Sequence, residues 1–280
     1  MRAAFVDIEG VRTRYLYAGS GPPVLLLHGV GVGGECFLRN IDVLADRCLV
    51  LAPDMLGHGF TDAVEYGGGP PQPATVHHLW ALCDHLGITN VSVLGSSYGA
   101  LIAALMWFAR PQAVPRLILV GSGAVFHPPA EQSATFHAVY ANAAQAMGDP
   151  TLESCRKRIA NICYDPKSVA EEMLLLQLTS YALPNRFEAY KATIAGLIGS
   201  VDSTEHRVYT RLEELAVPTL IIVGREDVRA NWKFHAEGHG RIPNSRFVIM
   251  EGCGHLPFME HPAEFNRLVS DFLEDRTAGG

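Results

Sequence analysis

The first candidate for a chemical role is the pentapeptide Gly-Ser-Ser-Tyr-Gly at 95–99. It follows a short apolar segment that predicts a strand and precedes an alanine-rich segment that predicts a helix. A serine at so tight a strand-to-helix turn has a strained backbone, and the residues two before and two after it must lack side chains. Only Ser97 has glycine at both positions, because Ser96 would have Leu94 and Tyr98 there. Ser97 is therefore the candidate nucleophile, and an ordinary Gly/Ser turn is the alternative.

A nucleophilic hydroxyl needs a base within hydrogen-bond reach, and the base needs an acid that fixes its tautomer. Ligand crevices of open α/β sheets lie past the carboxyl ends of the strands, so polar residues at these places are the candidates. Asp227 lies in a Gly-Arg-Glu-Asp turn after one predicted strand, and His255 lies in a glycine-flanked loop after the last. The order Ser97, Asp227, His255 is the one that this sheet topology uses. Glu226 as the acid and a structural role for His255 are the alternatives.

The elements that must position these residues alternate along the chain between apolar strands and helical patterns. Strands are predicted at 3–9, 11–18, 24–27, 48–52, 91–94, 116–120, 219–223 and 246–250, and helices at 36–46, 74–86, 100–109 and 262–272. This pattern predicts an α/β fold with a mostly parallel, doubly wound eight-stranded sheet. The first two strands form a hairpin that turns at Gly10.

The alternation breaks in the middle of the chain, where no strand pattern occurs. Helical patterns there cover 131–147, 151–163, 167–181 and 186–198. We expect a helical cap at 126–206, inserted after the sixth strand, and an α/β core formed by 1–125 and 207–280. A helical insertion at the strand ends would lie over the ligand crevice.

Composition excludes several classes of protein. The 280 residues are 48% hydrophobic and 18% charged, as in a globular protein. A net charge of -7 argues against a nucleic-acid surface. Six scattered cysteines without a C-x-x-C pair predict reduced thiols in a cytoplasmic protein, and we expect no signal peptide and no membrane partner. A small-molecule substrate is the expected partner, a homodimer is compatible with the sequence, and residues 276–280 are expected to fray.

Four motifs together resemble the α/β-hydrolase superfamily, nearly from end to end of the chain. They are the H-G-x-G loop at 28–31, the G-x-S-x-G turn at 95–99, the G-x-x-D turn at 224–227 and the G-H turn at 254–255. Each motif alone is weak, whereas their joint appearance in this order is specific.

The resemblance implies a role for each matched residue. Ser97 is the nucleophile, His255 the general base and acid, and Asp227 the residue that orients the histidine. An oxyanion hole is implied from the backbone N–H groups of Tyr98 and Val30, with that of Gly31 as a further candidate. Asp54 looks catalytic by its place after a strand, but the resemblance implies a structural role, bonded to the glycine-rich loop.

No metal and no cofactor are expected. His235 and His239 are four residues apart, but Gly238 and Gly240 weaken the helix that would align them as ligands. The glycine-rich loop near residue 31 lacks the G-K-[ST] of a phosphate loop.

The helical insertion and the Cys-Gly-His sequence at 253–255 look most like the subgroup that contains meta-cleavage-product hydrolases, which split a carbon–carbon bond in ring-opened aromatics. Those enzymes typically have Asn before the nucleophile, Met after it and Trp after the catalytic histidine. Here these positions hold Ser96, Tyr98 and Leu256. They also carry an arginine in the insertion that pairs with a substrate carboxylate, for which Arg186 is the nearest candidate.

These departures favour a serine hydrolase that cleaves a small to medium, mostly apolar carboxylic ester through an acyl-enzyme. Gly31, Ser96, Arg186 and Leu256 are the candidate substrate contacts. A carbon–carbon hydrolase of vinylogous 1,5-diketones is the alternative from the same superfamily. A perhydrolase and a ligand receptor on a hydrolase scaffold are further alternatives. An arginine near Ser97 would favour the carbon–carbon reaction, and an all-apolar pocket would favour neutral esters.

Overall fold

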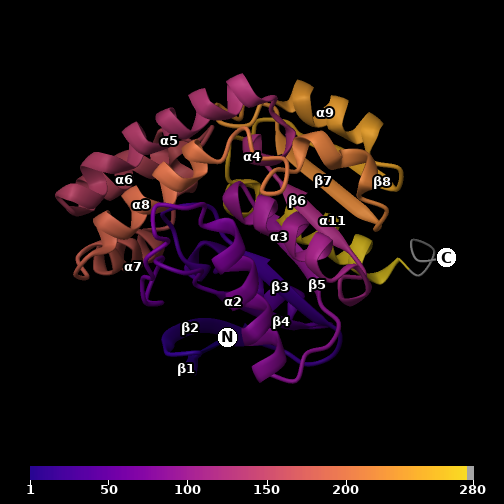
Figure 1. Cartoon of the computed structure of the whole chain (residues 1–280), viewed down its shortest axis with the longest axis horizontal. Helices are drawn as coiled ribbons and strands as arrows, with labels where there is room; N and C mark the ends of the chain where they lie inside the picture. Colours follow the sequence, from indigo (N-terminus) through magenta and orange to yellow (C-terminus); the bar gives the residue numbers. More distant parts are fainter. Residues whose placement is uncertain (276–280) are drawn as a thin grey trace.

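The computed structural model describes residues 1–275 and contains one eight-stranded sheet (Figure 1). Its strand order is β1-β2-β4-β3-β5-β6-β7-β8, with antiparallel pairing of β1 with β2 and of β2 with β4, and parallel pairing elsewhere. The strands are β1 (Arg2–Ile8), β2 (Val11–Ala18), β3 (Pro23–Leu27), β4 (Leu49–Pro53), β5 (Ser92–Ser96), β6 (Leu117–Val120), β7 (Thr219–Gly224) and β8 (Ser245–Met250). The predicted mostly parallel sheet is confirmed.

The first hairpin turns through Glu9 and Gly10, whose φ angles are 53° and 84°. Two successive positive φ angles match the twist of the flanking strands. In the middle of the sheet the strands are apolar on both faces, and every residue of β5, β6 and β7 is buried. Such continuous apolar runs suit a sheet that helices cover on both sides.

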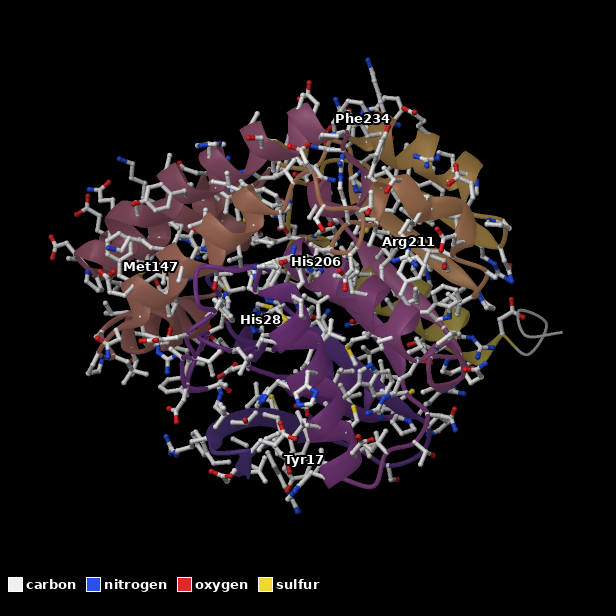
Figure 2. All side chains as sticks on the ribbon, viewed as in Figure 1. Tyr17, His28, Met147, His206, Arg211 and Phe234 are labelled. Atoms are coloured by element: carbon white, nitrogen blue, oxygen red, sulfur yellow. The ribbon has the colours of Figure 1, made fainter. Side chains whose placement is uncertain are left out.

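Helices of the core cover both faces of this sheet (Figure 1). On one face lie α2 (Gln72–His85), α3 (Tyr98–Ala109) and α9 (Trp232–Arg241), and on the other lies α11 (Pro262–Glu274). The short α1 (Ile41–Leu44) contacts α11. The core also contains α10 (Pro257–Glu260) and the short turns η1 (Gly34–Phe37), η2 (Pro111–Ala113) and η4 (Tyr209–Glu214). Side chains fill the layers between them, with His28 near the middle of the molecule (Figure 2).

The helices between β6 and β7 gather beside the sheet as a separate group, at the left of Figure 1. They are α5 (Pro129–Gly148), α6 (Leu152–Ala160), α7 (Glu171–Tyr181) and α8 (Arg186–Gly199), preceded by the short α4 (Gly123–Phe126) and interrupted by η3 (Pro166–Ser168). We refer to α5–α8 as the cap. These helices lie within the segment predicted to be helical and after the sixth strand.

One sequence prediction of a helix is wrong. The expected helix at 36–46 is broken into η1 and the four-residue α1, because the Asn40 side chain at the break donates to the Phe258 carbonyl (3.0 Å) and to Asn266 Oδ1 (2.8 Å). The helix that Gly238 and Gly240 were expected to weaken, α9, spans Trp232–Arg241. A Cβ on Gly238 would lie 2.4 Å from the Phe126 ring, so this glycine permits close packing of the helix.

Residues 276–280, which were expected to fray, lie outside the described residues. Within residues 1–275, no helix has both the length and the apolar character that crossing a membrane requires.

Candidate active site

Ser97 joins β5 to α3 with φ 54° and ψ −113°, a conformation that residues other than glycine rarely adopt. The glycines around it are required by space as well as by the turn. A Cβ on Gly95 would lie 2.1 Å from the Gly99 carbonyl oxygen, and a Cβ on Gly99 would lie 2.2 Å from the Leu27 carbonyl oxygen. The chain thus folds into a sharp elbow that presents Ser97 at the carboxyl end of the sheet.

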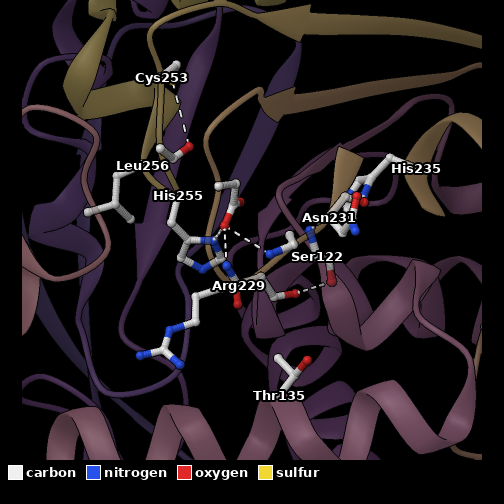
Figure 3. A network of polar contacts seen from close by, with 12 residues as sticks. Ser122, Thr135, Arg229, Asn231, His235, Cys253, His255 and Leu256 are labelled. Carbon is white, nitrogen blue, oxygen red and sulfur yellow. Dashed lines mark hydrogen bonds and ion pairs between the residues drawn. The ribbon is translucent and has the colours of Figure 1, made fainter. Parts of the chain in front are cut away.

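His255 and Asp227 are brought together from the loops after β8 and β7. Nδ1 of His255 lies 2.8 Å from Asp227 Oδ2 and 3.0 Å from Oδ1. Asp227 Oδ1 also accepts from the backbone N–H groups of Arg229 (2.7 Å) and Ala230 (2.9 Å) (Figure 3). A carboxylate held in this way fixes the tautomer with the proton on Nδ1 and leaves Nε2 as the basic atom. Glu226, the alternative acid, instead accepts from the Cys253 backbone N–H (2.9 Å).

A series of hydrogen bonds through Ser122 and His235 supports the Ser97 turn, and the sequence did not predict it. Ser122 donates its hydroxyl to the Ser97 carbonyl (2.7 Å), and the Ser122 N–H donates to His235 Nε2 (3.0 Å). His235 donates through Nδ1 to the Asn231 carbonyl, at 2.9 Å (Figure 3). Burial lowers the pKa of His235 to about 4, so the ring is neutral and serves as an acceptor. This explains His235 as a structural residue.

The implied oxyanion loop is bound by the cap through its carbonyl groups. The Val30 carbonyl accepts from Arg158 Nη2 (3.1 Å), and the Gly31 carbonyl accepts from the Tyr181 hydroxyl. Gly31 has φ +74°, and a Cβ there would lie 2.6 Å from Arg158 Nη2. These contacts hold the peptides that carry the Gly31 and Val32 N–H groups.

Tyr98 opens α3, so its backbone N–H has no acceptor within the helix. Its side chain is buried, and its hydroxyl lies 3.2 Å from Thr75 Oγ1 on α2. Burial raises the pKa of the Tyr98 hydroxyl, so this group stays protonated. The ring therefore anchors the start of α3, and the wall of the cavity described below does not include it.

A cavity at the elbow is lined by Ser97 and His255 together with residues of the cap. Much of its wall is apolar and includes Val32, Val139, Ile159, Ile162, Met173 and Phe258. Ser96 and Leu256, two of the predicted substrate contacts, also line it. Gly31 does not, but its neighbours Val30 and Val32 do. No acidic residue of the described chain lines this cavity.

Arg186, the predicted carboxylate contact, does not line the cavity in the described chain. Its guanidinium donates instead to the Thr61 carbonyl. The cap arginine that does line the cavity is Arg158, which is 5% exposed. Its Nε and Nη1 atoms have no hydrogen-bond partner among the described residues.

The start of α6 fixes the direction of Arg158. Thr151 and Ser154 form a capping box, in which the side-chain oxygen of each residue accepts from the backbone N–H of the other at 3.0 Å. Counting from this start, Arg158 lies three residues after Cys155 and four before Ile162, on the buried side of the helix. A cation on an apolar helix face is the sequence signal that could have identified it.

Asp54 lies behind the glycine-rich loop. Its Oδ1 accepts from the Gly34 N–H (2.8 Å) and its Oδ2 from the Phe60 N–H (2.8 Å), and it forms a buried ion pair with Arg14. His28 accepts through Nε2 from the Met55 N–H (2.9 Å). These contacts tie the loop after β3 to the loop after β4.

The sequence model of the alpha/beta hydrolase family matches residues 24–268. The chain belongs to the α/β-hydrolase family. This hydrolase is 29% identical to a 2-hydroxymuconate semialdehyde hydrolase of Pseudomonas putida over 281 residues, which cover 96% of this chain and 93% of that one. The eight-stranded sheet with helices on both faces is accordingly the α/β-hydrolase fold.

Solved structures show the same likeness. The meta-cleavage product hydrolase CumD of Pseudomonas fluorescens IP01 superimposes with a TM-score of 0.79 at 26% identity and covers 97% of both chains. The CarC serine hydrolase involved in carbazole degradation gives a TM-score of 0.81 at 26% identity, covering 98% of this chain and 99% of that one.

Proposed function

We propose that this hydrolase cleaves a carbon–carbon bond beside a carbonyl in a substrate that carries a carboxylate, as in meta-cleavage products. The observation that carries the proposal is Arg158, a buried guanidinium with unpartnered Nε and Nη1 atoms in the cavity of Ser97 and His255. A buried charge without a counterion is costly, and no carboxylate of the described cavity wall offsets this one. A substrate carboxylate would supply both the missing charge and the missing hydrogen-bond acceptors.

The relatives support this substrate class. One relative is named as a hydrolase of 2-hydroxymuconate semialdehyde and a structural neighbour as a meta-cleavage product hydrolase, at 29% and 26% identity. In this chain the cap arginine at the cavity is Arg158 of α6, while Arg186 binds the Thr61 carbonyl.

In the proposed reaction, Ser97 Oγ attacks the substrate carbonyl carbon while His255 Nε2 takes its proton. Backbone N–H groups of Tyr98 and of the loop at Val30 and Gly31 bind the oxyanion, each contributing about 3 kcal/mol to transition-state stabilisation. The carbon–carbon bond then breaks, and its electron pair leaves with the fragment that carries the carboxylate.

The departing carbon takes the proton from His255, and the acyl group remains on Ser97. Water, deprotonated by His255, attacks this acyl-enzyme, releases the second carboxylic acid and returns the proton to Ser97. The negative charge that develops on the leaving fragment is delocalised toward its own carboxylate, where Arg158 is proposed to bind it.

Ester hydrolysis by the same residues is the second candidate. Ser96 and Leu256 line the cavity, and neither adds a charged group that would stabilise a carbon leaving group. An alkoxide leaving group needs only the proton that His255 already holds.

The test compares turnover of a vinylogous 1,5-diketone dienoic acid with that of a neutral p-nitrophenyl ester. We expect a higher kcat/KM for the acid and loss of both activities in Ser97→Ala. Arg158→Gln should lower kcat/KM for the acid roughly 10- to 100-fold more than for the neutral ester, because both reactions lose the hydrogen bond to the Val30 carbonyl but only the acid loses a carboxylate contact. Arg156→Gln is the matched control, because Arg156 is half-exposed on the same helix and pairs with Glu171 (2.9 Å). Faster hydrolysis of the ester than of the acid, with both activities lowered equally by Arg158→Gln, would refute the carbon–carbon proposal.

A further inference from the structure

A second arginine, Arg229, lines the same cavity and belongs to the core rather than to the cap. It lies in the loop after β7, two residues past Asp227, whereas Arg158 lies in the cap. Figure 3 shows the Arg229 side chain extending away from the His255 ring. The cavity wall thus contains two guanidinium groups from separate elements and, among the described residues, no carboxylate.

Asp227 is the acidic residue nearest to Arg229 in the sequence, but its carboxylate already has hydrogen-bond partners. It binds His255 Nδ1 and the backbone N–H groups of Arg229 and Ala230. In the part of the chain that the structure describes, no hydrogen bond or ion pair joins the Arg229 guanidinium to another residue.

The surroundings of Arg229 agree with an excess of positive charge in the cavity wall. Burial is the main cause that lowers the pKa of Arg229, and the positive charge of Arg158 acts in the same direction. Asp227 and Tyr190 oppose the shift without reversing it. Because both guanidinium groups line one cavity, their positive charges repel each other.

We propose that Arg229 forms a second anion subsite, so that the cavity prefers a substrate with two carboxylates over one with a single carboxylate. This inference rests on the proposed function, which assigns the first carboxylate to Arg158. A monocarboxylate would compensate one of the two cavity cations and leave the other half-buried beside it. A dicarboxylate compensates both and allows each guanidinium to donate to its own acceptor.

Two conjugated six-carbon acids provide matched probes. Muconate carries a carboxylate at both ends of the diene and sorbate carries one, so they differ little except in charge. Isothermal titration calorimetry on the intact protein gives their dissociation constants without requiring turnover. We expect muconate to bind about 10-fold more tightly than sorbate, which corresponds to one added charge-assisted contact.

Arg229→Gln should remove the muconate advantage and leave sorbate binding within about twofold of its original value. Arg229→Lys, which keeps the charge, should retain part of the advantage. Arg225→Gln is the matched control, because Arg225 lies in the same loop and pairs with Glu251 (2.7 Å) outside the cavity. Melting temperatures of all variants check that the fold is kept.

Two outcomes would overturn the second subsite. One is equal binding of muconate and sorbate by the unaltered protein. The other is an equal loss of both ligands in Arg229→Gln, which would mean that both arginines hold a single carboxylate. Failure of the proposed function looks different, because sorbate binding would then be unchanged in Arg158→Gln while the Arg229 results could still hold.

Discussion

Ser97 has a backbone conformation that is strained for any residue with a side chain, with φ 54°. The surrounding structure maintains it at several points. The Ser97 N–H donates to the Val120 carbonyl (2.9 Å), and its carbonyl accepts from the Ser122 hydroxyl (2.7 Å). The elbow therefore depends on β6 and the loop after it as well as on its own glycines.

Replacing Gly99 by alanine tests this dependence. The added Cβ would lie 2.2 Å from the Leu27 carbonyl oxygen, so β3 and α3 must separate. We expect a loss of about 3 kcal/mol in the free energy of unfolding, measured by urea denaturation, together with loss of hydrolysis. Gly240→Ala is the control, because nothing lies within 4 Å of a Cβ there and the residue is in α9. It should be neutral or stabilising by about 0.5 kcal/mol. Equal effects of the two substitutions would contradict the packing argument.

Asp227→Asn tests the tautomer of His255. An amide can present its N–H to Nδ1 and so favour the wrong tautomer, with the proton on Nε2. We expect kcat to fall by roughly 10³- to 10⁴-fold, with the melting temperature little changed. Glu226→Gln is the control, because Glu226 binds the Cys253 N–H rather than the imidazole, and it should keep most of the activity. A larger loss in Glu226→Gln would reassign the acid.

At the scale of elements, the cap contributes directly to the loop that is implied to bind the oxyanion. Arg158 of α6 and Tyr181 of α7 donate to the Val30 and Gly31 carbonyls. Because a peptide plane is rigid, fixing a carbonyl also fixes the direction of the N–H on the following residue. Cap position and the geometry of the loop are thus coupled.

Tyr181→Phe removes one of these bonds and keeps the ring. We expect kcat to fall about 10-fold with KM nearly unchanged, since the loop would be less well oriented toward charge that develops in the transition state. Tyr164→Phe is the control, because Tyr164 is an exposed tyrosine of the cap segment. If both variants retain full kcat, Tyr181 serves only to stabilise the cap, by about 1 kcal/mol.

The sequence predicted the sheet well because continuous apolar runs such as those at 24–27 and 219–223 are stable only when both faces are buried. It failed where a long-range contact overrides local propensity. The side chain of Asn40 ends a turn by bonding distant residues, and Gly238 serves packing against Phe126 rather than flexibility.

The candidate site shows the same division. Ser97, Asp227 and His255 could be predicted because motifs mark tight turns, and the structure places Asp227 at His255; their catalytic roles stay predictions. The choice between Arg186 and Arg158 could not be settled by distance along the chain. It depends on the rotation of each cap helix, which the capping box at 151–154 sets for α6.

At the scale of the whole molecule, the net charge of -7 contrasts with a cavity whose charged wall residues are arginines. Overall charge therefore repels an anionic ligand at long range, while the cavity attracts it at short range. Selectivity for anions is accordingly expected to appear in the lifetime of the complex more than in the rate of encounter.

The interior also contains neutral histidines, which make stability depend on pH. Burial lowers the pKa of His28 to about 4, of His58 to about 3 and of His235 to about 4, against an ordinary value of 6.5. Above pH 6.5 both folded and unfolded chains carry these rings neutral. As the pH falls below 6.5, the unfolded chain binds protons at these rings and the folded chain does not, so stability is lost progressively down to about pH 4.

Each of these rings contributes a slope of up to about 1.4 kcal/mol per pH unit, and the three together up to about 4 kcal/mol. Urea denaturation at pH 7.5, 6.5 and 5.5 should therefore show a free energy of unfolding that falls steeply only below pH 6.5. His235→Gln should reduce the pH dependence of the free energy of unfolding by about a third, even if it lowers stability overall. The reason is that it removes one of the three rings that stay neutral in the folded chain. His85→Gln, at an exposed position of α2, should leave the slope unchanged. A free energy of unfolding that stays constant down to pH 5.5 would mean that the folded and unfolded chains take up the same protons. That result would contradict the acceptor role of His235 toward the Ser122 N–H.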